Sequence, residues 1–140
     1  MINTSLIRSF GILNRTFHNF ISKSILDKDI SFSDSFFLIN IGEKEGITQE
    51  EISSYLAIDK AAVARSVKSM EGKGYLRIVK SESDKRNKKL YLTDSGKNMY
   101  DFIQGLNKQW VDYVMDNLDT DDMKNFIQTI DGLSERAKKN

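Results

Sequence analysis

The sequence predicts a mostly α-helical fold of the α+β class, in which one β-hairpin follows a group of helices. Three observations lead to this prediction. Apolar residues recur at steps of three and four along most of the chain, which is the spacing of helices with one buried face. Gly72 and Gly74 are followed by two short apolar stretches with a polar stretch between them, which is typical of a hairpin. A hydrophobic content of 39% in 140 residues is enough to bury the core of one globular domain.

A long helix is expected over residues 5–26, and a shorter one should follow it. The apolar side chains of the long helix are spaced almost as heptads, and they are Leu6, Phe10, Leu13, Phe17 and Phe20. Ser33 is a candidate cap for the second helix, which should stop near residues 42–46, where two glycines occur. The apolar residues of this second helix are Phe36, Phe37, Ile39 and Ile41.

The central segment is predicted to contain two helices joined by a tight turn. Thr48 and Glu51 have the spacing of a capping box, so a short helix should begin there and bury Ile52 and Leu56. Asp59 is a good N-cap for the next helix, which should run to residue 70 or 71. One face of this helix is apolar, with Val63, Val67 and Met70, and the other carries Lys60, Ala61, Ala64, Arg65 and Lys68.

The hairpin and two further helices complete the predicted fold. Gly72 and Gly74 are expected to supply left-handed residues that end the preceding helix and turn the chain. Residues 75–79 and 90–92 should form the strands, with a polar tip between them. Thr93 should cap a long helix with an apolar stripe over residues 97–118, and a last helix is expected over 121–137 after a break at residues 116–120.

Composition excludes several classes of function. The chain has no Cys, so it can form neither a disulfide, nor a thiolate zinc site, nor a cysteine nucleophile. Its one histidine, His18, argues against most metal sites and general-base chemistry, and no nucleophile is paired with a base, so we expect neither an enzyme nor a bound cofactor. The longest apolar run, residues 36–39, is far below the roughly 20 residues that a membrane span needs, and a cytoplasmic location is expected.

Positive charge is concentrated in one segment of the chain. The formal net charge is +1, but residues 60–89 contain ten basic and three acidic residues, a net charge of +7. The rest of the chain therefore carries −6. Such asymmetry is typical of a polyanion-binding element in a soluble protein, although a solvated lysine-rich face without a partner would also show it.

The predicted elements form a winged helix-turn-helix. Its parts are two helices joined by a tight turn, of which the second has a basic face, and the basic hairpin that follows them. In this arrangement the second helix fits the major groove of DNA and the hairpin, or wing, reaches the neighbouring minor groove. At the wing tip Asp84 precedes Arg86 by two residues, so in a strand-like segment both side chains would point to one side and pair. A positioned arginine suits the narrow minor groove of A·T-rich DNA, whereas Lys85, Lys88 and Lys89 should neutralise phosphates.

Residues 47–100 resemble the core of the MarR family of bacterial transcription regulators. The motifs that carry the resemblance are ITQEE at the start of the first helix of the pair, DK at the start of the second, MEGKG at its end, DKR in the wing and LTDSG at the start of the next helix. The resemblance implies a single MarR-type domain over residues 1–140, with a winged helix-turn-helix core at about 32–92 and dimerisation helices at about 1–30 and 93–140. The long apolar stripes outside the core favour such a homodimer independently, because a monomer would expose them. The alternative is that these helices pack on their own subunit.

The resemblance also implies which residues contact DNA. Thr48 and Gln49 would contact phosphate, the second helix would face the major groove and Arg86, braced by Asp84, would enter the minor groove. The whole predicted set is Thr48, Gln49, Lys60, Ala61, Ala62, Ala64, Arg65, Lys68, Asp84, Lys85, Arg86 and Lys88. The family often has Ser or Thr where this chain has its three alanines, which leaves Arg65 as the main candidate for hydrogen-bonded base readout. Modest sequence discrimination with a large contribution from A·T content is therefore expected.

Two questions about function stay open in the sequence. Regulators of this family often bind a small aromatic or phenolic anion between the dimer helices and the winged core. Arg15, His18, Phe36 and Phe37 are candidates for such a pocket. The pattern favours the alternative, in which the two phenylalanines belong to the core and His18 is a surface or partly buried histidine. The alternative to a ligand-modulated repressor is a winged-helix module that binds a protein partner or coats DNA without responding to a ligand. A cationic recognition helix and a braced wing arginine favour the regulator.

Overall fold

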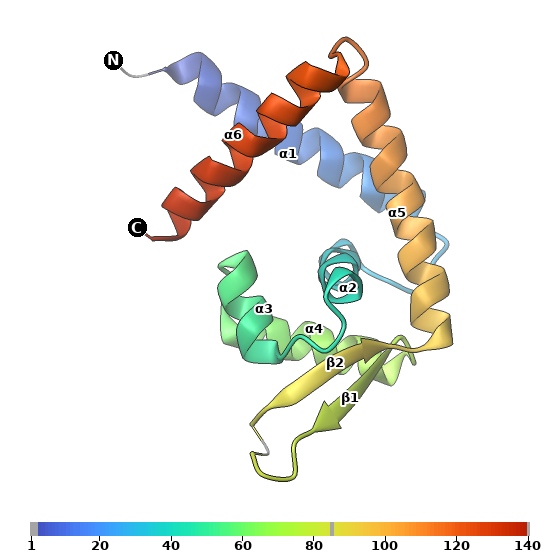
Figure 1. Ribbon diagram of the computed structural model, residues 1–140. Coiled ribbons are helices and arrows are strands. Elements are labelled where there is room, and N and C mark those ends of the chain that lie inside the picture. The colour runs from blue at the N-terminus through green and yellow to red at the C-terminus, as the bar shows by residue number, and fades with distance from the viewer. Residues whose placement is uncertain (1–2, 85, 140) are drawn as a thin grey trace. The chain divides into compact units, whose positions relative to one another are not determined.

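The structure is a computed structural model that describes residues 3–84 and 86–139 (Figure 1). Its helices are α1 (Thr4–Ser24), α2 (Phe32–Glu43), α3 (Gln49–Leu56), α4 (Lys60–Gly72), α5 (Asp94–Val114) and α6 (Thr120–Lys138). The strands β1 (Leu76–Lys80) and β2 (Lys88–Leu92) form one antiparallel hairpin between α4 and α5. The chain divides into two compact units, one ending at Asn107 within α5 and one beginning at Lys108. The predicted class, mostly helical with one hairpin, is confirmed.

The core of the first unit joins α2, α3, α4 and the hairpin. Leu38, Ile41, Ile52, Val63 and Leu90 come from these elements and are completely enclosed. Full burial of a side chain of this size stabilises a fold by roughly 1.5–3 kcal/mol. The apolar face predicted for the fourth helix therefore packs inward, and the opposite face of α4 is left for solvent.

The turn between α3 and α4 forms as the sequence predicts. Thr48 Oγ1 accepts a hydrogen bond from the Glu51 N–H at 3.1 Å, and Glu51 Oε1 accepts one from the Thr48 N–H at 3.1 Å, which completes the capping box. Ala57 ends α3 in a left-handed conformation with φ +54°. Asp59 then caps α4 by accepting a hydrogen bond from the Ala62 N–H at 3.3 Å.

Two local predictions are wrong. Ser31, not Ser33, caps α2, because its hydroxyl accepts a hydrogen bond from the Asp34 N–H at 3.1 Å. This places Phe32 in the first turn, where its ring stacks on His18 with 4.0 Å between the centroids. Gly72 is the last residue of α4, and of the two expected left-handed glycines only Gly74 has a positive φ, at +82°.

The second strand of the hairpin is longer than predicted, the first is shifted by one residue, and the hairpin is anchored at its base. Its register pairs Leu76 with Leu92 at the base and Lys80 with Lys88 near the tip. The strands extend into lysines because ladder hydrogen bonds use the backbone and do not require apolar side chains. Beside β2, the Leu90 carbonyl accepts a hydrogen bond from the Gly46 N–H at 2.8 Å, and the Leu90 N–H donates one to the Ile47 carbonyl at 2.9 Å. The segment before α3 therefore covers the free edge of β2.

Tyr75 and Thr93 tie the base of the hairpin to its neighbours. The Tyr75 hydroxyl donates a hydrogen bond to the Asp29 carbonyl at 3.0 Å, and burial raises the pKa of this hydroxyl. Thr93 Oγ1 accepts a hydrogen bond from the Gly96 N–H at 3.0 Å, which confirms Thr93 as the cap of α5, and donates one to the Gly74 carbonyl.

The second unit contains the end of α5 and all of α6. Asp119 caps α6 by accepting a hydrogen bond from the Asp122 N–H at 2.8 Å. None of the described residues of α6 is buried, although Met123, Phe126, Ile127, Ile130 and Leu133 recur along it at helical spacing. Among the described helices none is long and apolar enough to cross a membrane.

Candidate nucleic-acid interface

The outward face of α4 is cationic and narrow. Lys60, Ala61, Ala64, Arg65 and Lys68 are exposed, whereas Val63, Val67 and Met70 on the other side are buried. Ala62 is half-buried at the edge of the exposed face. Small alanines between long cations would let the helix backbone approach a groove closely, which is what a helix in the major groove of DNA needs.

The start of α3 is less suited to a phosphate than the sequence predicts. Both the hydroxyl and the N–H of Thr48 are engaged in the capping box. The first turn carries two carboxylates, Glu50 and Glu51, which disfavour an anion at this helix terminus. Glu50 Oε1 also lies 3.6 Å from Nζ of Lys60, the first residue of α4. Gln49, the other residue of the predicted phosphate contact, is half-buried and faces the hairpin side of α4.

The wing tip holds Arg86 beside Asp84. Asp84 Oδ1 accepts a hydrogen bond from the Arg86 N–H at 3.0 Å and lies 3.6 Å from Arg86 Nε. The pairing is the predicted one, but its cause is a turn closed by the Asn87 N–H donating to the Asp84 carbonyl at 2.9 Å, not the alternation of a strand. The Arg86 side chain is 92% exposed, so an ion pair here contributes at most about 1 kcal/mol to stability, and its effect is orientation. Lys85, also in the predicted set, lies outside the described residues.

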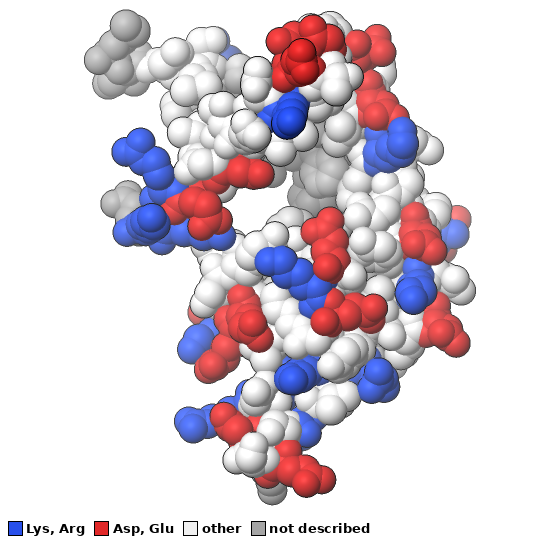
Figure 2. Space-filling model, viewed as in Figure 1, with Lys and Arg blue, Asp and Glu red and all other residues white. Residues whose placement is uncertain are grey.

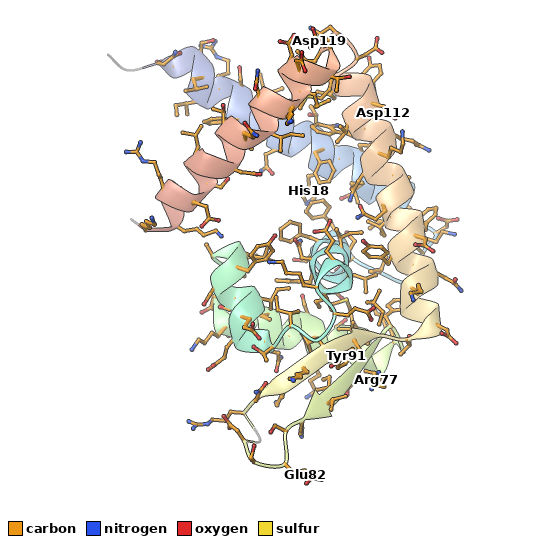
Figure 3. The ribbon with its side chains drawn as sticks, viewed as in Figure 1. His18, Arg77, Glu82, Tyr91, Asp112 and Asp119 are labelled. Carbon is orange, nitrogen blue, oxygen red and sulfur yellow. The ribbon has the colours of Figure 1, made fainter. Side chains whose placement is uncertain are left out.

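Part of the positive charge of residues 60–89 is engaged by other groups of the protein. Arg77 lies over the ring of Tyr91 on the opposite strand, with 4.8 Å from its guanidinium carbon to the ring centroid (Figure 3). Nζ of Lys73 lies 3.7 Å from Oδ1 of Asp29. On the face drawn in Figure 2, basic and acidic side chains are interspersed over α3 and the hairpin. The charge available to a polyanion is therefore carried by particular lysines and arginines, not by a uniform basic coat.

A recess of about 550 Å³ lies between α4 and the hairpin. We call it the lysine recess, and its lining residues are Gln49, Ala64, Val67, Lys68, Glu71, Ile78, Lys80 and Lys88. Three of them, Gln49, Lys68 and Lys88, belong to the predicted DNA-contact set, but Lys80 does not. The sequence held a signal for Lys80, because the alternation of Leu76 and Ile78 along β1 places it on the same face of the hairpin.

A second cavity, of about 260 Å³, is formed by α1, α2 and the first half of α5. It is lined by Phe17, Ile21, Ser35, Phe36, Ile39, Asn40, Glu43, Ile103 and Asn107. Among these residues Glu43 is the only ionisable one, and it carries negative charge. The described residues contain no cluster of His, Asp or Glu arranged to hold a metal ion.

Of the four predicted ligand-pocket residues, only Phe36 lines this cavity. Phe37 is 3% exposed and belongs to the core. The Arg15 guanidinium folds back over Gly11 on its own helix, and it lies 2.8 Å from where a Cβ on that glycine would be. His18 (Figure 3) stacks on Phe32, with its Nδ1 3.3 Å from the Ser22 hydroxyl. The structure therefore does not bring the predicted cation and aromatic walls together.

The fold and the cationic α4 and wing define a winged helix-turn-helix protein that binds DNA. The MarR family model matches residues 28–87. The HTH-type transcriptional regulator BilQ of Clostridium symbiosum is 31% identical over 114 residues, which cover 81% of this chain and 79% of BilQ. The HTH-type transcriptional regulator YybA of Bacillus subtilis is 24% identical over 135 residues, covering 96% and 87% of the two chains.

Solved structures agree on the fold. A MarR family transcriptional regulator from Listeria monocytogenes, crystallised with a 26mer DNA, superposes with a TM-score of 0.91 at 20% identity, covering 99% of this chain and 91% of that one. The chain belongs to the MarR family and is a DNA-binding transcriptional regulator, as the sequence motifs predicted. It belongs to a class of regulators, not of enzymes.

Proposed function

We propose that this regulator is a dimeric repressor that binds an A·T-rich pseudo-palindrome. The observation that carries the proposal is the pairing of an exposed cationic face on α4 with Arg86 held by Asp84 at the wing tip. Each subunit would place α4 in the major groove of one half-site and Arg86 in the adjacent minor groove. Where such a dimer covered a promoter it would exclude the polymerase, which is how it would repress.

The dimer is supported by apolar side chains that the described chain leaves exposed outside the winged core. In α1 they are Leu6, Ile7, Phe10 and Ile12, and in α6 they are Phe126, Ile127 and Leu133. An exposed apolar stripe on a helix usually marks an interface, because water contact with it is unfavourable, and each of these two helices has one. A second copy of the chain, offering the same helices, is the partner that the family resemblance favours.

The chemistry of α4 supports limited base readout. Ala61 and Ala64 are exposed and can contact thymine methyl groups, but they cannot donate hydrogen bonds to bases. Arg65 is the exposed residue at the centre of the helix that can read guanine through two hydrogen bonds. Much of the discrimination should therefore come from the width of the minor groove that Arg86 enters.

Selection of genomic fragments at about 150 mM salt should test this function, because specific and non-specific binding separate under such conditions. We expect enrichment of an A·T-rich inverted repeat with half-sites about one helical turn apart, as a dimer requires. Exchanging the central A·T steps for G·C should lower affinity. A single half-site would contradict the dimer, and no enrichment at all would favour a module for a protein partner.

We further propose that the cavity lined by Phe36 is an effector site. Its volume of about 260 Å³ suits one aromatic ring, since a cavity of about 150 Å³ already holds benzene. Its lining contains Glu43, Asn40 and Asn107 and no cation, so it favours a neutral or cationic aromatic compound over the phenolic anion expected from the sequence. A ligand here would contact α1, α2 and α5, and α2 packs on α4.

Thermal unfolding with three matched probes should reveal the charge preference of this cavity. We expect benzylamine, and less so benzyl alcohol, to raise the Tm more than benzoate does. At ten times its Kd a ligand stabilises by about 1.4 kcal/mol. Glu43→Gln should abolish the advantage of benzylamine over benzyl alcohol. A larger shift with benzoate than with benzylamine would restore the anion hypothesis.

A further inference from the structure

The lysine recess contains a like-charge arrangement that the fold does not require. The hairpin register places Lys80 directly opposite Lys88, on the face that carries the buried Leu76 and Leu90 nearer the base. Like charges at directly opposed positions destabilise a strand pair. Lys68 from α4 lines the same recess. Three cations from three elements thus converge where two apolar residues would extend the core.

These lysines are not neutralised by the protein. Among the described residues, none of the three forms an ion pair or stacks on an aromatic ring. Glu71 is the one carboxylate in the lining, so the recess keeps a net positive charge of two. Gln49 adds an amide that can donate hydrogen bonds. The group that complements this lining is an anion with several acceptor oxygens, which is the chemistry of a phosphate.

The position of the recess favours a phosphate of duplex DNA. The sugar–phosphate backbone separates the two grooves, so a strand contacted by α4 in one groove and by the wing in the next must pass between them. The recess lies between these two elements, and about 550 Å³ is room for a nucleotide-sized segment. The neighbouring alternative, the first turn of α3, carries two carboxylates and an occupied cap.

We propose that the lysine recess is the seat of a DNA backbone phosphate and that Lys80 is a phosphate-binding residue of this regulator. The inference rests on the proposed binding of DNA by α4 and the wing together. It adds a contact on β1, behind the wing tip, that would fix the angle between the recognition helix and the wing on the duplex. The contact carries no base information, so its loss should weaken binding to every sequence alike.

The salt dependence of binding to a mixed-sequence duplex should test the proposal. For Lys80→Gln we expect the slope of log affinity against log salt to fall by roughly 1, which is about a five-fold loss of affinity at about 150 mM salt. The Tm of this variant should equal or exceed that of the unaltered protein, because one member of a like-charge pair is removed. Lys97→Gln, an exposed lysine of α5, is the matched control and should leave the slope unchanged.

One further variant and one small ligand make the test decisive. Lys80→Arg should retain the slope, since it keeps the charge. An unchanged slope in Lys80→Gln, or an equal loss in Lys80→Arg, would overturn the proposal. Calorimetric titration with adenosine diphosphate tests the other source of phosphate: binding that Lys80→Gln abolishes, with no change in the DNA slope, would assign the recess to a free nucleotide. If the unaltered protein bound no duplex, the proposed function itself would fail.

Discussion

Replacing Gly96 by alanine should lower the free energy of unfolding by about 3 kcal/mol, the upper end of the usual cost of overpacking. A Cβ at this position would lie 2.0 Å from the Tyr75 carbonyl oxygen and 2.9 Å from its carbonyl carbon. Both are backbone atoms, so no side chain can rotate away to relieve the contact. The carbonyl is further held by the Thr93 N–H, which donates a hydrogen bond to it at 3.1 Å.

The close approach at Gly96 explains the glycine of the LTDSG motif in physical terms. Thr93 caps α5 and also bonds to Gly74, so the start of α5 is pressed against the start of the hairpin. Only a residue without a side chain fits between them. Separating the two elements would break the Thr93 contacts, and accepting the clash would distort the strand. Either response should destabilise the winged core as a whole.

Gly105→Ala is the matched control for this prediction, because it makes the same change in the same helix. A Cβ at Gly105 meets nothing within 4 Å, and alanine in a helix is favoured over glycine by roughly 0.5–1 kcal/mol. Urea unfolding at fixed protein concentration should therefore show a lower free energy of unfolding for Gly96→Ala and a higher one for Gly105→Ala. In thermal unfolding the Tm of Gly96→Ala should be lower by roughly 10 °C. Equal stability of the two variants would show that the α5–hairpin junction is not tightly packed.

Much of the fold could be predicted because local chemistry determines it. The capping box at Thr48 and the cap at Asp59 depend on side chains that bond to backbone groups three residues away, and this spacing is visible in the sequence. The buried face of α4 follows from helical periodicity alone. The winged helix-turn-helix and its family motifs are built from these local features, which is why the class of protein was predicted correctly.

The features that the sequence did not predict depend on contacts between distant segments. Ser31 and Ser33 have equal local merit as caps, and the stacking of Phe32 on His18 of another helix favours Ser31. The side of the hairpin on which Lys80 lies relative to Lys68 depends on strand register and on packing against α4. Which residues line the cavity likewise depends on how α1, α2 and α5 pack, so the sequence could not show that Arg15 and His18 lie outside its lining.

Arg86→Ala should weaken binding to the selected operator by roughly 1–3 kcal/mol, or about 5- to 150-fold. The guanidinium is exposed and lies beside Asp84, which biases its orientation and lowers the cost of ordering it in a groove. A narrow A·T-rich minor groove has a strong negative potential that favours an inserted arginine. The loss should therefore shrink when the A·T steps facing the wing are changed to G·C.

Two neighbouring variants separate positioning from charge at the wing. Asp84→Asn keeps an oxygen that can accept the Arg86 N–H bond but removes the ion pair, so its loss of affinity should be smaller than that of Arg86→Ala. Lys88→Ala should reduce the salt slope by roughly 1 and weaken all sequences alike, as expected of a lysine whose proposed partner is a phosphate. Titrations of each variant against the operator and its G·C version measure these differences. Equal losses for Arg86→Ala and Lys88→Ala on both duplexes would mean that the wing supplies only charge, and that specificity comes from α4.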